Sequence, residues 1–330
     1  MTEKKKELIL CICLLAMIFA VMVFLLSNQQ RVAADNGNIT LGQPSPTLTT
    51  ESNNIAGGLS HNLVLQKDLP GNTDHIMTFK VVPPHYTRND IISLGKKFNI
   101  SEPYQIKEGN EGLSIREVDD DIHVLILNSG WIEYWNSNRH SVNSLDIPGN
   151  LPSDDEAVTI ATKFLRDRDL LPADAELRKI DHVKTYNLGD GGQESVVWED
   201  IEVWYGRKLN GYPVEGTKLM LAIGAHGDPI EFLSNWRNYT PYQEMPVKEP
   251  GTAFQDLKTE GVSVGMHMPD KVSISDMYLA YRTKAGSDTE KYLEPVWIFK
   301  GNVTENNTSI MPVNAYIPAL TDESVKSLSS

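Results

Sequence analysis

The sequence predicts an α+β protein in which tandem units, each a helix packed on a small antiparallel sheet, follow one N-terminal transmembrane helix. Three observations support this class. One long uncharged apolar run lies near the N-terminus, segments of helical apolar spacing then alternate with segments of period two, and Gly-, Asn- and Asp-rich turns separate them. The predicted parts are a cytoplasmic stub (1–7), a transmembrane helix (8–27), a flexible stalk (28–72) and three α+β repeats (73–150, 151–245 and 246–330).

The transmembrane prediction rests on Leu8–Leu26, nineteen residues without a charge. This length matches the roughly 20 helical residues needed to cross a hydrocarbon core. Lys4–Lys6 precede the run and only Arg31 follows it closely, which places the N-terminus in the cytoplasm. We therefore expect a single-pass protein of the cell membrane whose bulk is extracytoplasmic.

One alternative and two exclusions accompany this topology. The small residues Val32–Ala34 would also suit a signal peptide cleaved after Ala34, although the apolar run exceeds the roughly 7–15 residues usual for such a signal. Both cysteines, Cys11 and Cys13, lie inside the run, so the outer part contains no disulfide. The net charge of −14 disfavours nucleic acid and anionic lipid as partners.

The stalk and the first repeat differ in composition. Residues 28–72 are rich in Asn, Thr, Ser, Gly and Pro and show no sustained apolar period, which is typical of a flexible tether. The first repeat then predicts a strand, a helix capped by Thr87 or Asn89, and three further strands. These segments are Ile76–Val82, Asn89–Phe98, Gly112–Val118, His123–Leu127 and Trp131–Trp135.

The second repeat opens with the spacing of a capping box, Ser153 followed by Glu156, and Pro172 ends its helix. The strands expected after it are Lys179–Tyr186, Ser195–Arg207, Lys218–Ile223 and Ile230–Tyr239. The third repeat predicts a short helix at Gly251–Glu260 and three strands, Lys271–Arg282, Leu293–Gly301 and Ile310–Pro318.

Parts of the second and third repeats resemble a known superfamily. Asp154–Ala157 opens a helix, and the hairpin Leu209–Gly216 (Leu-Asn-Gly-Tyr-Pro-Val-Glu-Gly) follows before two further strands. This order resembles PepSY-like domains, which include propeptides of secreted metalloproteases. The usual acidic residue before the glycine of the next turn is displaced here to Asp228.

The third repeat adds Tyr278–Tyr281 and Leu293–Phe299 (Leu-Glu-Pro-Val-Trp-Ile-Phe), which are similar to Yyc-type extracytoplasmic regulatory proteins. The resemblance covers about residues 150–301. It implies an ectodomain that modulates a membrane sensor kinase, although a shared fold does not by itself carry function.

No catalytic constellation is visible in the sequence. There is no nucleophile elbow, no His-Glu-x-x-His, no phosphate-binding loop, and no histidine pair at metal-ligand spacing. The sequence therefore predicts a protein that is not an enzyme and that uses no cofactor or metal. A hydrolase would require carboxylates such as Glu199, Asp200, Glu202 and Glu215 to converge in one pocket.

The tryptophans are candidates for binding. Trp131 and Trp135, or Trp198 and Trp204, would share a sheet face by their even spacing. They would either fill a thin core or line a groove for a peptide or glycan. The residues predicted to bind a partner are Trp236, Arg237 and Tyr239.

Six Asn-x-Ser/Thr sequons are possible glycan sites in an exported chain, and they are Asn38, Asn99, Asn238, Asn302, Asn306 and Asn307.

Together these features predict a membrane-anchored extracytoplasmic binding or regulatory protein. Its expected partner is another envelope or membrane protein, either a sensor or a protease, and the membrane itself is contacted through residues 8–27. A secreted hydrolase, a propeptide-like protease inhibitor and a passive cell-envelope component remain as alternatives.

Overall fold

The computed structural model describes residues 58–118, 122–136, 151–188, 194–264, 271–286, 288–305 and 308–329. The predicted stub, the predicted transmembrane helix and most of the predicted stalk lie outside these ranges. Among the described residues, no helix has the length and apolarity to cross a membrane. The chain forms two compact units. We call His75–Met245 with Ala280–Pro295 the central unit, and the remainder (Met1–Asp74, Pro246–Leu279 and Val296–Ser330) the terminal unit.

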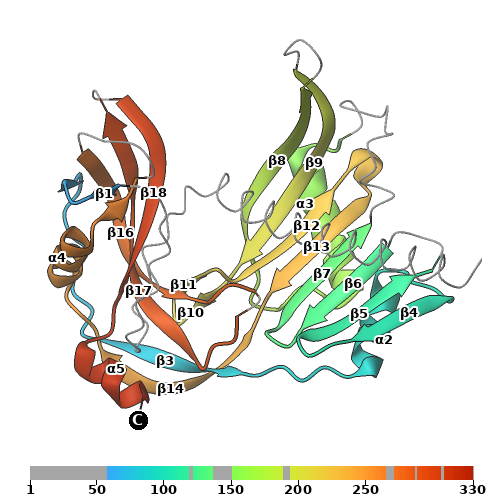
Figure 1. The fold of residues 1–330 in the computed structure, drawn as a ribbon, viewed down its shortest axis with the longest axis horizontal. Helices are drawn as coiled ribbons and strands as arrows, with labels where there is room; N and C mark the ends of the chain where they lie inside the picture. The colour runs from blue at the N-terminus through green and yellow to red at the C-terminus, as the bar shows by residue number, and fades with distance from the viewer. Residues whose placement is uncertain are drawn as a thin grey trace, which may run out of the picture. The chain divides into compact units, whose positions relative to one another are not determined.

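The central unit contains a fully antiparallel eight-stranded sheet in the order β4-β5-β6-β7-β13-β12-β9-β8 (Figure 1). Its strands are β4 (Tyr104–Glu108), β5 (Gly112–Glu117), β6 (Ile122–Leu127), β7 (Trp131–Asn136), β8 (Glu176–Leu188), β9 (Glu194–Gly206), β12 (Lys218–Ile223) and β13 (Pro229–Asn235).

This sheet overturns the predicted fold class. The expected order of a helix followed by strands does occur twice, but the strands do not form separate small sheets. Strand β7 of the first half pairs with β13 of the second, with Trp135 opposite Glu231 and Trp131 opposite Asn235. Pairing in this way satisfies two backbone edges that independent small sheets would leave open. The prediction of tandem small-sheet units is therefore wrong.

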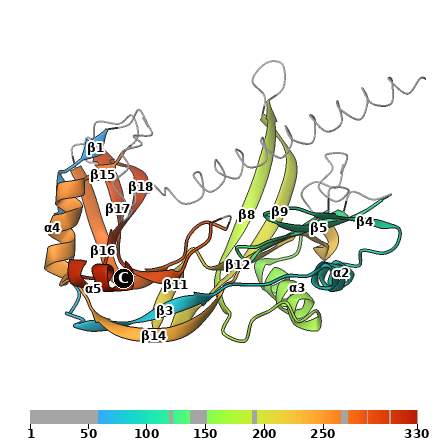
Figure 2. The same ribbon diagram turned by 60° about the horizontal axis from the view of Figure 1, so that its bottom comes forward.

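Two helices cover one face of the sheet. Helix α2 (Arg88–Lys97) packs on β5 and β6, and α3 (Asp154–Asp167) packs on β9 and β12 (Figure 2). Thr87 forms a capping box with Asp90, and Ser153 forms one with Glu156, which confirms the predicted helix starts. Ala157, Ala161 and Leu165 of α3 are fully buried in a core that both helices share.

Further short strands complete the central unit. They are β3 (His75–Val82), β10 (Lys208–Leu209), β11 (Tyr212–Glu215) and β14 (Asn238–Pro246). The hairpin of β10 and β11 pairs in parallel with the end of β16 (Lys271–Arg282), where Val214 lies opposite Tyr281. The start of β17 (Tyr292–Glu305) pairs with β3, where Leu293 lies opposite Phe79.

The terminal unit packs helix α4 (Pro250–Glu260) on β17 and β18 (Thr308–Pro318). It also contains β1 (Leu59–Ser60), β2 (Leu63–Leu65), β15 (Val262–Ser263) and helix α5 (Asp322–Ser329). The Phe254 and Phe299 ring centroids lie 6.2 Å apart, and Trp297 Nε1 donates to the Lys248 carbonyl at 2.9 Å. Strands β1 and β2 lie inside the predicted stalk, where they pair with β15 and β16.

The structure differs from the sequence-predicted strands at two places, for local reasons. Strand β4 was not expected because its sequence, Tyr-Gln-Ile-Lys-Glu, is mostly exposed and offers little apolar signal. The segment expected as one strand at Ile230–Tyr239 is two, β13 and β14, separated by Trp236 and Arg237. The interruption lies where Arg237 enters the polar network described below.

Candidate interaction site on the central sheet

The second face of the central sheet carries aromatic and acidic side chains. Because strand side chains alternate, residues adjacent to the helix-facing core residues Val203, Leu221 and Phe232 point the other way. Neither α2 nor α3 covers this face. On the described parts of β7, β13, β12 and β9 it carries Trp131, Glu133, Trp135, Glu231, Leu233, Asn235, Lys218, Met220, Ala222, Asp200, Glu202 and Trp204. We call this set the aromatic face.

Two hydrogen-bonded Trp–Glu pairs fix the positions of indole rings on the aromatic face. On β7, Trp131 Nε1 donates to Glu133 Oε2 at 3.3 Å, and on β9, Trp204 Nε1 donates to Glu202 Oε2 at 3.0 Å. Each pair joins positions two apart on one strand, so both members lie on the same side of the sheet. The two indole rings pack on a small buried cluster of Met220, Ala222, Ile230 and Leu233.

Ammonium groups lie near these rings. Lys218 Nζ lies 5.7 Å from the Trp131 ring centroid and 5.5 Å from that of Trp204. Lys179 Nζ lies 5.1 Å from the Trp204 centroid and forms an ion pair with Asp181. Distances within about 6 Å allow attraction between a cation and the π face of an indole.

The carboxylates of the aromatic face are buried. Glu133, Asp200, Glu202 and Glu231 are each exposed by 9% or less. Burial raises the pKa of Glu133 above its usual value, because desolvation disfavours the charged form, and the hydrogen bond from Trp131 opposes the shift only in part. Four carboxyl groups of this face are therefore largely withdrawn from solvent.

The variant Glu133→Gln should test how the buried carboxyl group affects stability at different pH values. The raised pKa means that the folded state binds a proton more tightly than the unfolded chain does, so Glu133 lowers stability as pH rises through the unfolded-state value near 4.5 to the higher folded one. We expect Glu133→Gln to match the wild type at pH 4 and to exceed it in free energy of unfolding at pH 8, as measured by urea titration. An equal difference at both pH values would contradict this assignment.

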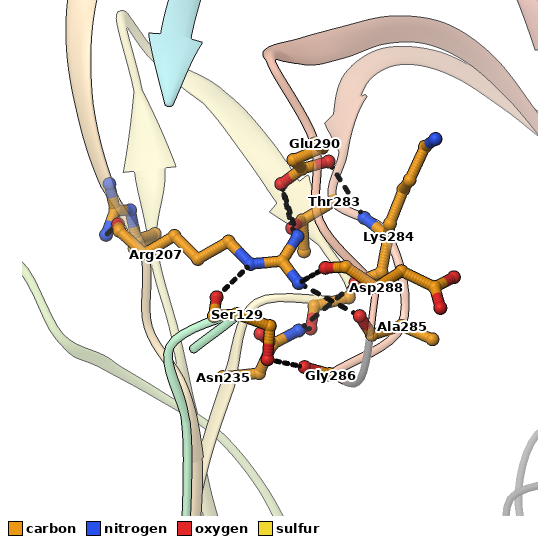
Figure 3. A network of polar contacts seen from close by, with 11 residues as sticks. Ser129, Arg207, Asn235, Thr283, Lys284, Ala285, Gly286, Asp288 and Glu290 are labelled. Carbon is orange, nitrogen blue, oxygen red and sulfur yellow. Dashed lines mark hydrogen bonds and ion pairs between the residues drawn. The ribbon is translucent and has the colours of Figure 1, made fainter. Parts of the chain in front are cut away.

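A second polar centre adjoins the aromatic face at the start of β14. Arg237 Nε donates to the Ser129 carbonyl at 3.0 Å, and Nη1 donates to Glu290 Oε1 at 2.6 Å and Thr283 Oγ1 at 3.0 Å (Figure 3). Its Nη2 donates to the carbonyls of Ala285 (2.9 Å) and Asp288 (2.5 Å). The Arg237 and Glu290 side chains are only 1% and 2% exposed. We call these contacts the Arg237 network.

The network fixes the connection between β16 and β17. Glu290 also accepts from Thr283 Oγ1 at 2.6 Å and from the Lys284 amide at 3.0 Å, and Ser129 Oγ donates to the Gly286 carbonyl. Gly286 lies so close to Trp131 that an added Cβ would meet the indole Cε3 at 2.0 Å. Only glycine therefore fits here without displacing the Trp131 ring.

The predicted partner-binding residues lie in and around this network. Arg237 is buried within it, and Trp236 is half-buried and packs on the helix-side core. The Arg207 guanidinium lies 5.3 Å from the Trp236 ring centroid and 4.8 Å from that of Tyr239. Burial, with the nearby charge of Glu290, raises the pKa of the Tyr239 hydroxyl. Partner binding by these three residues stays a prediction, while the placement of Arg237 serves the fold.

The carboxylates that the sequence offered for a hydrolase site do not all lie in one place. Asp200 and Glu202 lie on the aromatic face, whereas Glu215 lies on β11 and pairs with Arg178 at 3.3 Å. The side chain of Glu199 lies outside the described residues. Within the described ranges, no group of three or more His, Cys, Asp or Glu side chains is arranged to hold a metal ion.

The six predicted glycan sites differ in exposure, and only three of them lie within the described residues. Asn99 and Asn238 are exposed and Asn302 is half-buried, whereas Asn38, Asn306 and Asn307 lie outside the described residues. Glycosylation at these positions stays a prediction.

An open groove of about 470 Å³ lies beside the start of α3. Leu151, Pro152 and Ile160 supply its apolar wall, and Asp155 and His226 are solvent-exposed at its rim. The described side chains place no buried polar group in this groove, so we assign it no ligand.

Sequence reasoning missed the role of Lys218. Even spacing predicted that Trp131 and Trp135, or Trp198 and Trp204, would share a sheet face, but Lys218 begins a different strand and belongs to no motif. Only the strand order β7-β13-β12-β9 brings it near both Trp131 and Trp204.

Comparison with known proteins gives little further information. No family model and no curated protein matches the chain. Among solved structures, an uncharacterized protein from Eubacterium rectale ATCC 33656 is similar, with 12% sequence identity and a TM-score of 0.48 over 80% of this chain and 90% of that one. A likeness at this level supports no argument about function.

Proposed function

We propose that this chain is a membrane-anchored extracytoplasmic binding or regulatory protein that acts by contact with another envelope or membrane protein, a sensor or a protease. The contact surface in this proposal is the accessible part of the aromatic face, the half-buried side chains of Trp131, Trp135, Trp204 and Lys218. The observation that carries the proposal is that the Trp131 and Trp204 rings are partly exposed, held in place by hydrogen bonds, and not covered by the helices of their own unit. Tryptophan anchors of this kind are enriched at protein interfaces.

The resemblance to Yyc-type regulators and the anchor predicted at residues 8–27 favour a regulatory role at a membrane. The hydrolase alternative receives less support from the described side chains. Among its candidate carboxylates, Asp200 and Glu202 lie on β9, whereas Glu215 lies on β11 and pairs with Arg178. That the protein is not an enzyme remains part of the proposal.

Site-specific photocrosslinking in the native membrane tests this proposal. Benzoylphenylalanine replaces Trp204 in the full-length chain, and a matched chain carries it at Val118, an exposed position (49%) in the central unit. We expect the Trp204 chain to capture one dominant membrane sensor or protease that the Val118 chain does not. Capture of the same abundant envelope proteins from both positions would favour the passive-component alternative.

A further inference from the structure

Lys218 occupies a position between two aromatic rings. It lies at the start of β12, with Asn235 opposite it on β13. The rings that approach its ammonium come from the strands on either side of this pair, Trp131 from β7 and Trp204 from β9. The two Nζ-to-centroid distances, 5.7 and 5.5 Å, differ by only 0.2 Å, so neither ring dominates.

The two rings have contacts other than Lys218 that hold them in position. Each indole N–H is used by a glutamate of its own strand, and both rings rest on the cluster that contains Met220 and Leu233. Gly286 approaches the Trp131 ring so closely that it restricts movement toward the β16–β17 connection. A site whose walls are already ordered loses less conformational entropy when it binds.

Charge on the aromatic face favours a cation. On β7, β13, β12 and β9 the described side chains of this face include four acids, Glu133, Asp200, Glu202 and Glu231, and one base, Lys218. Lys179 of the neighbouring strand β8 adds a second ammonium, 5.1 Å from the Trp204 ring centroid. The raised pKa of Glu133 has desolvation as its main cause. A cationic side chain of a partner would therefore bring positive charge to a predominantly acidic face.

We propose that the Trp131–Trp204 pair is a receptor for a lysine or arginine side chain of the partner protein, and that Lys218 occupies this receptor when the partner is absent. Lys218 is then an internal competitor that lowers the affinity for the partner's side chain. This inference rests on the proposed function, because it assigns a chemistry to the same contact surface.

The experiment uses Lys218→Met, which keeps an unbranched side chain and removes the ammonium. The full-length protein, wild type and variant, is titrated with choline and with its uncharged isostere 3,3-dimethylbutan-1-ol, and the indole N–H resonances of Trp131 and Trp204 are followed by NMR. We expect choline to shift both resonances in the variant and to bind about tenfold more weakly to the wild type. The isostere should shift neither resonance.

Two controls keep the result interpretable. Lys218→Gln replaces Lys218→Met if the latter fails to fold, and Lys218→Met combined with Trp204→Leu should lose the choline response. Equal choline affinity in wild type and variant, or equal shifts with the uncharged isostere, would overturn the proposed receptor.

The outcome separates this inference from the proposed function. If Trp204 photocrosslinks a single sensor or protease but choline does not bind to the Lys218 variants, only the cation receptor is overturned. If choline binds as expected and Lys218→Met also increases capture of that sensor or protease, the receptor and its occupant are both supported. Choline binding with unchanged capture would overturn a lysine or arginine of the partner as the occupant.

Discussion

Replacement of Arg237 by methionine should lower the free energy of unfolding of the central unit by about 3–5 kcal/mol. The reason is that Glu290, only 2% exposed, would keep its burial and lose the guanidinium that compensates its charge. The carbonyls of Ser129, Ala285 and Asp288 would lose their donors as well. Urea unfolding of the full-length chain, followed by tryptophan fluorescence, measures the change.

A matched variant supplies the control for this prediction. Arg178 also pairs with a glutamate, Glu215, at 3.3 Å, but the two side chains are 36% and 23% exposed. Arg178→Met should therefore cost no more than about 1 kcal/mol. Removal of both charges, Arg237→Met with Glu290→Gln, should recover part of the loss, since no buried charge is then left unpaired. Equal effects at Arg237 and Arg178 would show that the Arg237 network does not stabilise the unit.

Phe98→Ala should produce the second large effect, a loss of about 3–5 kcal/mol that reaches both halves of the central sheet. The Phe98 ring stacks on Tyr134 of β7 with centroids 4.3 Å apart, and it lies 5.4 Å from Phe232 of β13 and 6.2 Å from Phe164 of α3. It thus joins the first helix to the second half of the sheet at the β7–β13 boundary.

Hydrogen exchange can distinguish a joined sheet from two separate ones. In Phe98→Ala we expect amide protection to fall together in β5, β6, β9 and β12, because one cooperative unit contains all four strands. Phe98→Leu should retain most of the protection, since it keeps much of the buried apolar volume. Loss confined to β5 and β6 would show that the two halves are independently stable.

Local structure was well predicted where its cause is local. The Ser153–Glu156 spacing predicted the start of α3, and the apolar period of Ala157, Ala161 and Leu165 predicted the face that it buries. Strand β16, Lys271–Arg282, begins and ends where its sequence predicted. In each case the signal lies within a few residues of the structure that it specifies.

The candidate site could be predicted only in part. Even spacing placed Trp131 and Trp135 on one face, but it left open whether that face was a core or a surface. The burial of Arg237 was not predicted, because an arginine beside aromatic residues is equally typical of an exposed binding patch. Its partners Ser129 and Glu290 are 108 and 53 residues away in the sequence.

The sequence by itself determined helices α2, α3 and α4 and most strands, because propensity, capping and periodicity act over short distances, and it also gives the acidic composition and the apolar N-terminal run. Only the tertiary structure decided that two helix-and-strand repeats share one sheet through β7 and β13, and that Lys218 lies between Trp131 and Trp204. The physical reason is that backbone hydrogen bonds between strand edges are the same for any sequence. Which edges pair is therefore decided by packing between residues far apart in the chain.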